Sequence, residues 1–391
     1  MKEKRAIWAL SAAHLITDLY SPVLPAILPL LISVHGYSYL TAGIIVTVFQ
    51  LASSFTQPIV GWLYDKKGIA IHISFSVLIG SVFISAVGLV DSYPLILAFA
   101  AIGALGHAFF HPGALGTVSK LAEDSSRGRL TSYFVVGGNL GFAIGPVLAG
   151  AAVGLFGLEG MIVLVLPGLV TAFVLKWILP PPAAKPADQE REMQGGSVPR
   201  PTVVAAALLV FGSAFRAWAI FGAMAFLPTY LTECGLSVTN ANLAVTVMLL
   251  CGVAGQVVGG TISDRYGRKE YTLFGVAAAI PPFWVFLHSQ GTIAFVALFI
   301  FGFFLWSTFS VTVAMAHELV PGSVGIVSGL MLGLAVGAGG AGVAVSGYIA
   351  DMFSLQFALF GLLAPIAMAF LLFLLVPFPW RLFGCRARSS A

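Results

Sequence analysis

Asp18 and Arg216 are the residues of this 391-residue chain with the most chemical potential, because each interrupts a long apolar stretch. A full charge at the centre of a bilayer costs at least about 2.5–3.5 kcal/mol, and such residues mark functional sites by default. A carboxylate can carry a proton, and a guanidinium pairs with phosphonate or carboxylate groups through parallel hydrogen bonds. We therefore expect Asp18 to couple protons and contact substrate, and Arg216 to bind an anionic group of the substrate. Mutual pairing of the two charges is the alternative.

Three histidines are candidates to assist Asp18. His14 and Asp18 are four residues apart and share one face of a helix, and the same spacing relates His107 to His111. We expect His14 to assist the proton step and the other two to line or relay its path. Helix-to-helix hydrogen bonding is the alternative role. The sequence shows no third convergent metal ligand, so we predict neither a metal site nor another cofactor. Gln50 is assigned to the substrate site.

The composition predicts an all-α membrane protein. The chain is 59% hydrophobic and 9% charged, whereas a soluble domain carries roughly a quarter charged residues. A membrane helix needs about 20 mostly apolar residues. We count twelve spans, at approximately Arg5–Ile32, Tyr39–Tyr64, Ile69–Val90, Tyr93–Leu121, Leu130–Phe156, Gly160–Leu179, Val203–Thr232, Asn240–Ser263, Tyr271–His288, Thr292–Leu319, Val324–Met352 and Leu355–Phe378.

The basic residues predict the orientation. Of 19 Lys and Arg, all except Arg216 precede the first span or follow an even-numbered span. Such loops are cytoplasmic, so we predict an inner-membrane protein with both termini in the cytoplasm. The basic residues are spread over short loops and do not form a stripe, which argues against nucleic acid as a partner. The expected partners are a small-molecule substrate, protons and the lipid bilayer.

The two halves of the chain repeat each other at an offset of 199 residues. Val46-Thr47-Val48 matches Val245-Thr246-Val247, and Asp65 matches Asp264. Each half has six spans, so the repeat is parallel, about an axis along the membrane normal, and it predicts a cleft for substrate between two bundles. We predict bundles at 1–179 and 201–391 and a polar linker at 180–200. A monomer suffices for this arrangement.

A loop signature follows the second and the eighth span. An Asp at a helix end can face the positive end of a neighbouring helix or an arginine, and can thereby hold one side closed. The first copy runs Gly61-Trp-Leu-Tyr-Asp65-Lys66, and the second runs Gly260-Thr-Ile-Ser-Asp264-Arg265-Tyr-Gly-Arg268. Both resemble the loop signature of the major facilitator superfamily, the second copy more closely. We expect a gate formed by Gly61, Asp65, Lys66, Gly260, Asp264, Arg265 and Arg268.

The fifth span carries small residues at four-residue spacing. Gly141 and Gly145 permit close helix contact, and Pro146 removes a backbone donor. The stretch resembles the glycine-proline signature of exchangers in this superfamily, and close packing alone is the alternative.

Further motifs resemble the fosmidomycin-resistance transporters. They are His14-x-x-x-Asp18, Leu24-Pro25-Ala26, Thr47-Val48-Phe49-Gln50-Leu51, Gln57-Pro58 and Ser328-Gly329-Leu330. The resemblance implies an efflux carrier for a small phosphonate antibiotic, driven by proton exchange.

Other functions remain open from the residues alone. An anion at Arg216 would free Asp18 to bind a proton, which suits symport, so an importer of a small organic anion is the main alternative. A membrane-embedded enzyme is disfavoured because Asp18 is the only carboxylate well inside a span. A channel usually needs a ring or filter from several subunits, whereas this chain has a complete two-fold repeat of its own. Transport driven by ATP is disfavoured because the sequence has no phosphate-binding loop.

Overall fold

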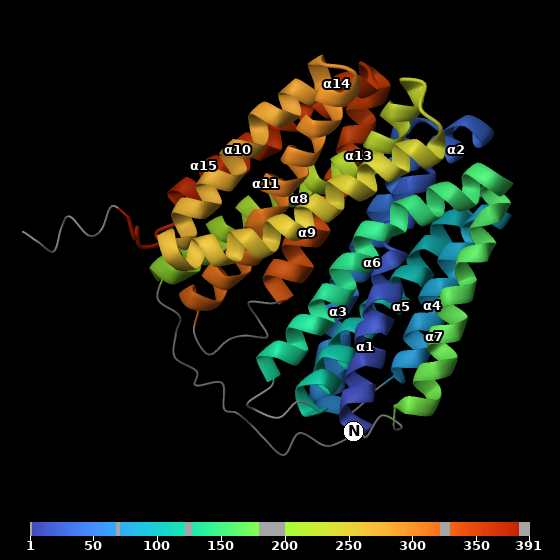
Figure 1. Cartoon of the computed structure of the whole chain (residues 1–391), viewed down its shortest axis with the longest axis horizontal. Helices are drawn as coiled ribbons and strands as arrows, with labels where there is room; N and C mark the ends of the chain where they lie inside the picture. Colours follow the sequence, from blue (N-terminus) through green and yellow to red (C-terminus); the bar gives the residue numbers. More distant parts are fainter. Residues whose placement is uncertain (1, 68–70, 122–126, 180–199, 321–328, 383–391) are drawn as a thin grey trace, which may run out of the picture. The chain divides into compact units, whose positions relative to one another are not determined.

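A computed structural model describes residues 2–67, 71–121, 127–179, 200–320 and 329–382 (Figure 1). These residues form helices and no strand. Eleven segments within them are long and apolar enough to cross a membrane, and Ile73–Leu89 is a shorter apolar helix at the predicted third span. The predicted all-α membrane fold with twelve apolar segments is confirmed.

The helices relevant to the sites have the following bounds. They are α1 (Lys2–Leu19), α2 (Val23–His35), α3 (Tyr39–Lys67), α4 (Ile73–Ala86), α5 (Tyr93–Leu121), α6 (Arg127–Phe156), α7 (Val165–Ile178), α8 (Arg200–Glu233), α9 (Val238–Tyr266), α10 (Arg268–His288), α11 (Gly291–Leu319), α13 (Ala335–Met352), α14 (Leu355–Gly361) and α15 (Leu363–Leu375).

The chain divides into two compact units. Unit 1 comprises Met1–Met193 and Met224–Thr246, and unit 2 comprises Gln194–Ala223 and Val247–Ala391. The predicted bundles, 1–179 and 201–391, were defined by the sequence repeat. The two units are defined by contacts between residues, so Met224–Thr246 falls in unit 1. The segment Met224–Thr246 goes with unit 1 because its side chains bond there: Asn242 donates to the carbonyl oxygen of Ala26 at 2.9 Å.

In unit 1, the helices that carry the ionisable residues lie side by side (Figure 1). α1 packs along α6 and also contacts α5 and α7, and α5 packs against both α3 and α4. This arrangement brings the histidines of α5 next to the face of α1 that carries His14 and Asp18. In unit 2, α10 packs against α11 and α15.

The first span is broken near its middle, directly after Asp18. α1 ends at Leu19 and α2 starts at Val23, and the chain turns through Tyr20–Pro22. Pro22 and Pro25 have no backbone N–H, so a continuous helical ladder cannot run through the start of α2. Non-helical backbone at membrane depth is tolerated only inside protein, and discontinuous helices form the sites of many secondary transporters.

Candidate functional site

The carboxylate of Asp18 lies in the interior of unit 1 among three histidines. Its Oδ2 atom is 3.1 Å from Nε2 of His14, one turn earlier on α1. Its Oδ1 atom is 3.3 Å from Nε2 of His107 and 3.3 Å from Nε2 of His111, both on α5. The structure thus brings together the four residues that the sequence assigned to proton coupling, and it surrounds Asp18 with histidines of its own unit.

The hydrogen bonds of two imidazole rings leave three hydrogen-bond acceptors facing one another in this cluster. Nδ1 of His14 lies 2.8 Å from the carbonyl oxygen of Phe134, and Nδ1 of His111 lies 2.9 Å from that of His107. A carbonyl oxygen only accepts, so each Nδ1 carries a hydrogen, and in a neutral ring each Nε2 then keeps its lone pair. These two Nε2 atoms are 3.3 Å apart and both face the carboxylate. Such groups repel one another unless a proton or another cation lies among them.

A buried polar stripe on α3 supports His107. The hydroxyl oxygen of Ser53 is 2.8 Å from Nδ1 of His107, and Gln57 donates to the same oxygen at 3.3 Å. Because a hydroxyl can donate, the His107 ring can stay neutral with Nε2–H toward Asp18. Gln50 lies one turn before Ser53. Its buried amide nitrogen has no hydrogen-bond partner among the described residues, which leaves a donor free.

Glycines of α6 allow this cluster to exist. A Cβ at Gly138 would lie 2.4 Å from Nε2 of His14 and 2.7 Å from Oδ2 of Asp18. A Cβ at Gly141 would lie 1.9 Å from the carbonyl oxygen of Leu15, and one at Gly145 would lie 2.5 Å from that of Leu19. The glycine stripe therefore holds α6 directly against the part of α1 that carries His14 and Asp18.

We expect Gly138→Ala to displace the His14 and Asp18 side chains and to lower stability by about 1–3 kcal/mol, the usual cost of overpacking. Gly361→Ala is the matched control, because a Cβ there would meet nothing within 4 Å. Thermal unfolding of the two purified variants measures the difference. Equal midpoints for Gly138→Ala and Gly361→Ala would contradict this close packing of α6 on α1.

Arg216 lies halfway along α8, inside unit 2. Its residue exposure is 2%, and one guanidinium nitrogen donates to the hydroxyls of Thr308 at 3.2 Å and Thr312 at 2.9 Å. The guanidinium also lies over the ring of Phe309, 5.4 Å from its centroid. Its Nε atom has no hydrogen-bond partner, and within the described part of unit 2 no carboxylate pairs with it. The charge is buried among neutral groups.

A second glycine stripe packs beside Arg216. A Cβ at Gly339 of α13 would lie 2.4 Å from the Cβ of Ala217, and one at Gly342 would lie 2.1 Å from the Trp218 ring. In the sequence repeat α13 corresponds to α6, and α8 corresponds to α1. Each unit thus places a glycine-rich helix against the helix that carries its buried charge.

Asp18 and two of the histidines around it have the arrangement of metal ligands. The ligand atoms of His14, Asp18 and His111 all lie within 4.8 Å of one another. The sequence predicted no metal site because it showed no third convergent ligand; the structure brings three candidate ligands together, and the absence of a metal stays a prediction. Contact between α1 and α5 supplies the third ligand, which sequence spacing alone does not reveal.

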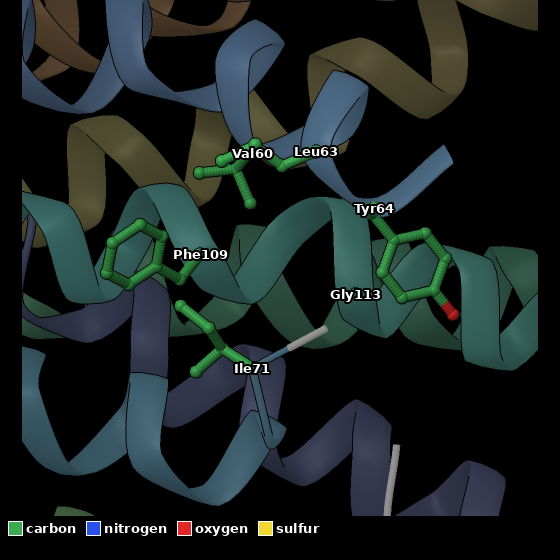
Figure 2. A pocket seen from close by; sticks show the side chains of 6 residues that line it. All are labelled: Val60, Leu63, Tyr64, Ile71, Phe109 and Gly113. Atoms are coloured by element: carbon green, nitrogen blue, oxygen red, sulfur yellow. The ribbon is translucent and has the colours of Figure 1, made fainter. Parts of the chain in front are cut away.

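A small cavity of about 40 Å³ lies elsewhere in unit 1 (Figure 2). Val60, Leu63 and Tyr64 of α3 line it, together with Ile71 and with Phe109 and Gly113 of α5. Phe109 and Gly113 are each two residues from a cluster histidine, which is about 200° around a helix. The cavity therefore faces away from Asp18, and its lining is mostly apolar.

Charged residues at one end of unit 2 form a network around the second loop signature. Arg268 pairs with Asp264 at 2.9 Å and also with Glu318. Arg381 donates to the carbonyl oxygen of Asp264, and Lys269 donates to that of Val376 at 2.7 Å. Arg265 contacts the Tyr266 ring.

The first loop signature is less fully described. The side chains of Asp65 and Lys66 lie outside the described residues. A Cβ at Gly61 would meet nothing within 4 Å, and one at Gly260 would meet only Oγ of Ser310, at 4.0 Å. The described residues therefore show no close helix packing at either glycine.

Several supporting residues were not found by sequence reasoning. Ser53, Thr308 and Thr312 are ordinary helix hydroxyls in the sequence, and only their partners give them a role. Glu318 lies near the end of α11, and its role is shown only by its pairing with Arg268, 50 residues earlier.

Comparison with known proteins identifies the class of this helical membrane protein. A family model described as Major Facilitator Superfamily matches residues 10–341 and 209–384. The chain belongs to the major facilitator superfamily and is a transporter, not an enzyme.

Individual relatives narrow the class. The chain is 34% identical over 374 residues to the fosmidomycin resistance protein of Escherichia coli (strain K12), covering 89% of this chain and 87% of that protein. This similarity confirms the resemblance seen in the motifs. The hexuronate transporter of Bacillus subtilis (strain 168) is 25% identical over 354 residues, covering 83% of each chain. A crystal structure of a bacterial homolog of the human lysosomal transporter Spinster shares the fold, with a TM-score of 0.84, 17% identity and coverage of 95% and 96%.

Proposed function

We propose that this transporter exports a small organic anion, of the phosphonate-antibiotic kind, in exchange for protons by alternating access. The observation that carries the proposal is the burial of Arg216, at 2% exposure, without a carboxylate partner in the described part of its unit. An unpaired buried charge is costly, and an anionic substrate group would offset that cost. The guanidinium fork suits phosphonate and carboxylate groups.

The names of two relatives support this chemistry. Fosmidomycin is a phosphonate, and a hexuronate carries a carboxylate. Both are small anions that also carry at least one hydroxyl group. Arg216 would bind the anionic group, and Asp18 and Gln50 would bind the polar groups of the substrate.

Proton coupling is assigned to the cluster of Asp18, His14, His107 and His111. At least one cation belongs among the facing Nε2 atoms and the carboxylate, and a proton is the simplest one. A substrate that donates an O–H or N–H hydrogen bond to Asp18 would bind best when the carboxylate is deprotonated. Substrate and proton would then exclude each other, which is the requirement for exchange.

The direction of transport follows from energetics. A bacterium holds a proton gradient directed inward, so only exchange can use that gradient to expel a solute. A resistance protein that acts by removing its antibiotic would need this coupling. Proton-coupled import of a small organic anion is the second candidate, because a protonated cluster attracts an anion.

The orientation proposed from the basic loops places both termini in the cytoplasm of an inner-membrane protein. The network of Asp264, Arg268 and Glu318 would then lie on the cytoplasmic side of unit 2. We assign it to the gate, together with Gly61, Asp65, Lys66, Gly260 and Arg265 of the two signatures.

We expect Arg268→Ala to slow transport at least about tenfold while lowering stability by less than about 1 kcal/mol, since these ion pairs are partly exposed. Arg5→Ala is the matched control, because Arg5 is an exposed arginine of α1 that lies outside the gate residues and has no carboxylate partner among the described residues. Initial transport rates in proteoliposomes measure both variants. If the two substitutions slow transport equally, the ion-pair network has no special part in gating.

A panel of phosphonates, carboxylates and neutral sugars, scored by thermal unfolding, tests the substrate class. A ligand at 100 times its dissociation constant stabilises by about 2.7 kcal/mol. We expect stabilisation by phosphonates and not by neutral sugars. Stabilisation by neutral sugars alone would contradict an anionic substrate.

A further inference from the structure

We infer that His14, His111 and Asp18 form a binding site for one divalent transition-metal cation of the zinc class. This site goes beyond the proposed transport function and does not depend on the identity of the exported solute. It lies wholly within unit 1, on α1 and α5.

The separations of the ligand atoms fit a tetrahedral ion. Bonds of about 2.0–2.1 Å at tetrahedral angles place neighbouring ligand atoms roughly 3.3–3.4 Å apart. The Nε2 atoms of His14 and His111 are 3.3 Å apart, and each faces a different oxygen of the same carboxylate: His14 Nε2 is 3.1 Å from Asp18 Oδ2, and His111 Nε2 is 3.3 Å from Asp18 Oδ1. Three protein ligands leave the fourth position for water, as in open zinc sites.

The Nδ1 atom of each ligating histidine lies within hydrogen-bond distance of a backbone carbonyl oxygen, as is typical of metal sites. A ligating histidine donates its other N–H to a carbonyl or carboxylate oxygen, which fixes the tautomer and aims the free lone pair at the ion. His14 has the carbonyl of Phe134 for this purpose, and His111 has the carbonyl of His107. Both rings are therefore held with their Nε2 lone pairs directed to one point.

The carboxylate has an unused acceptor at the same point. Oδ1 of Asp18 is buried, and neither of its 3.3 Å contacts, with His107 and with His111, has the geometry of a hydrogen bond. A bound cation would satisfy this oxygen together with both Nε2 lone pairs. The two imidazole ligands favour transition-metal ions such as Zn²⁺ and Ni²⁺ over Mg²⁺, which prefers oxygen ligands alone.

Metal titration of the full-length protein without a histidine tag, after treatment with a chelator, tests the site. Co²⁺ is the probe, because four-coordinate Co²⁺ absorbs visible light strongly. We expect one equivalent of Co²⁺ to give this spectrum, Zn²⁺ to abolish it stoichiometrically, and Mg²⁺ to have no effect. Absence of the Co²⁺ spectrum in the wild-type protein would overturn the proposal without recourse to any variant.

Two variants locate the ion. His111→Gln should weaken Co²⁺ affinity at least about 100-fold, because loss of a supporting residue alone commonly costs 10–100-fold. His288→Gln should leave affinity unchanged. Its Nδ1 is likewise 2.8 Å from a backbone carbonyl, that of Trp284, but it belongs to no ligand cluster among the described residues. Equal losses in the two variants would place the ion elsewhere.

Transport measurements separate this inference from the proposed function. If Zn²⁺ binds and blocks proton-driven transport, one cluster serves both ions. If Zn²⁺ binds and transport is unaffected, the metal site stands and the assignment of proton coupling to this cluster fails. If transport is proton-driven and no metal binds, the metal site fails and the proposed function stands.

Discussion

Arg216→Met is expected to abolish binding of the transported anion without destabilising the protein. Truncating one partner of a buried charge pair commonly costs 2–5 kcal/mol, so affinity should fall at least about 30-fold. The unfolding midpoint without ligand should stay the same or rise, because the guanidinium has no carboxylate partner in the described part of unit 2 and an apolar side chain suits its surroundings. Ligand-induced shifts of the unfolding midpoint measure both effects.

Arg216→Lys is the control, because lysine keeps the positive charge but lacks the planar set of guanidinium N–H donors. It should keep part of the affinity for a carboxylate and lose more for a phosphonate, because an ammonium does not form paired hydrogen bonds. If Arg216→Met unfolds at a much lower temperature, the guanidinium is a structural element and our assignment of the substrate site is wrong.

Asp18→Asn is expected to uncouple the transporter. An amide cannot take up a proton at physiological pH, so accumulation driven by a pH gradient should fall at least about 100-fold. Exchange of labelled for unlabelled substrate should persist, because it needs no net proton movement. Transport by proteoliposomes with and without a pH gradient separates these two activities.

Asp91→Asn provides the matched carboxylate control. Asp91 is exposed in the segment before α5, outside the histidine cluster. This variant should therefore transport like the wild-type protein. A pH-driven rate for Asp18→Asn equal to that of Asp91→Asn would exclude Asp18 as the coupling residue.

The sequence predicted the helical membrane fold well because that prediction depends on composition. A chain with 9% charged residues and regularly spaced polar loops has few alternatives in a bilayer. The division into packed units was harder to predict. It depends on long-range contacts such as the bond from Asn242 to Ala26, 216 residues apart.

For the site, spacing identified the ionisable residues but not their environment. His14 and Asp18 share a helix face by their four-residue separation, and so do His107 and His111. No pattern showed that these two faces would meet. The backbone carbonyl of Phe134 fixes the orientation of the His14 ring. Because every residue type has a backbone carbonyl, the sequence could not identify this partner. In the sequence, Gly138 is only one of several glycines in the fifth span. The structure alone shows that it lies next to the carboxylate of Asp18.

The most direct test of proton-coupled anion export is transport of a labelled phosphonate into proteoliposomes under an imposed pH gradient. Exchange predicts accumulation inside when the lumen is acidic, because protons leave as the phosphonate enters, and predicts no accumulation for Asp18→Asn. Accumulation when the lumen is alkaline would instead show symport. That result, or movement that ignores the gradient, would contradict export driven by proton exchange.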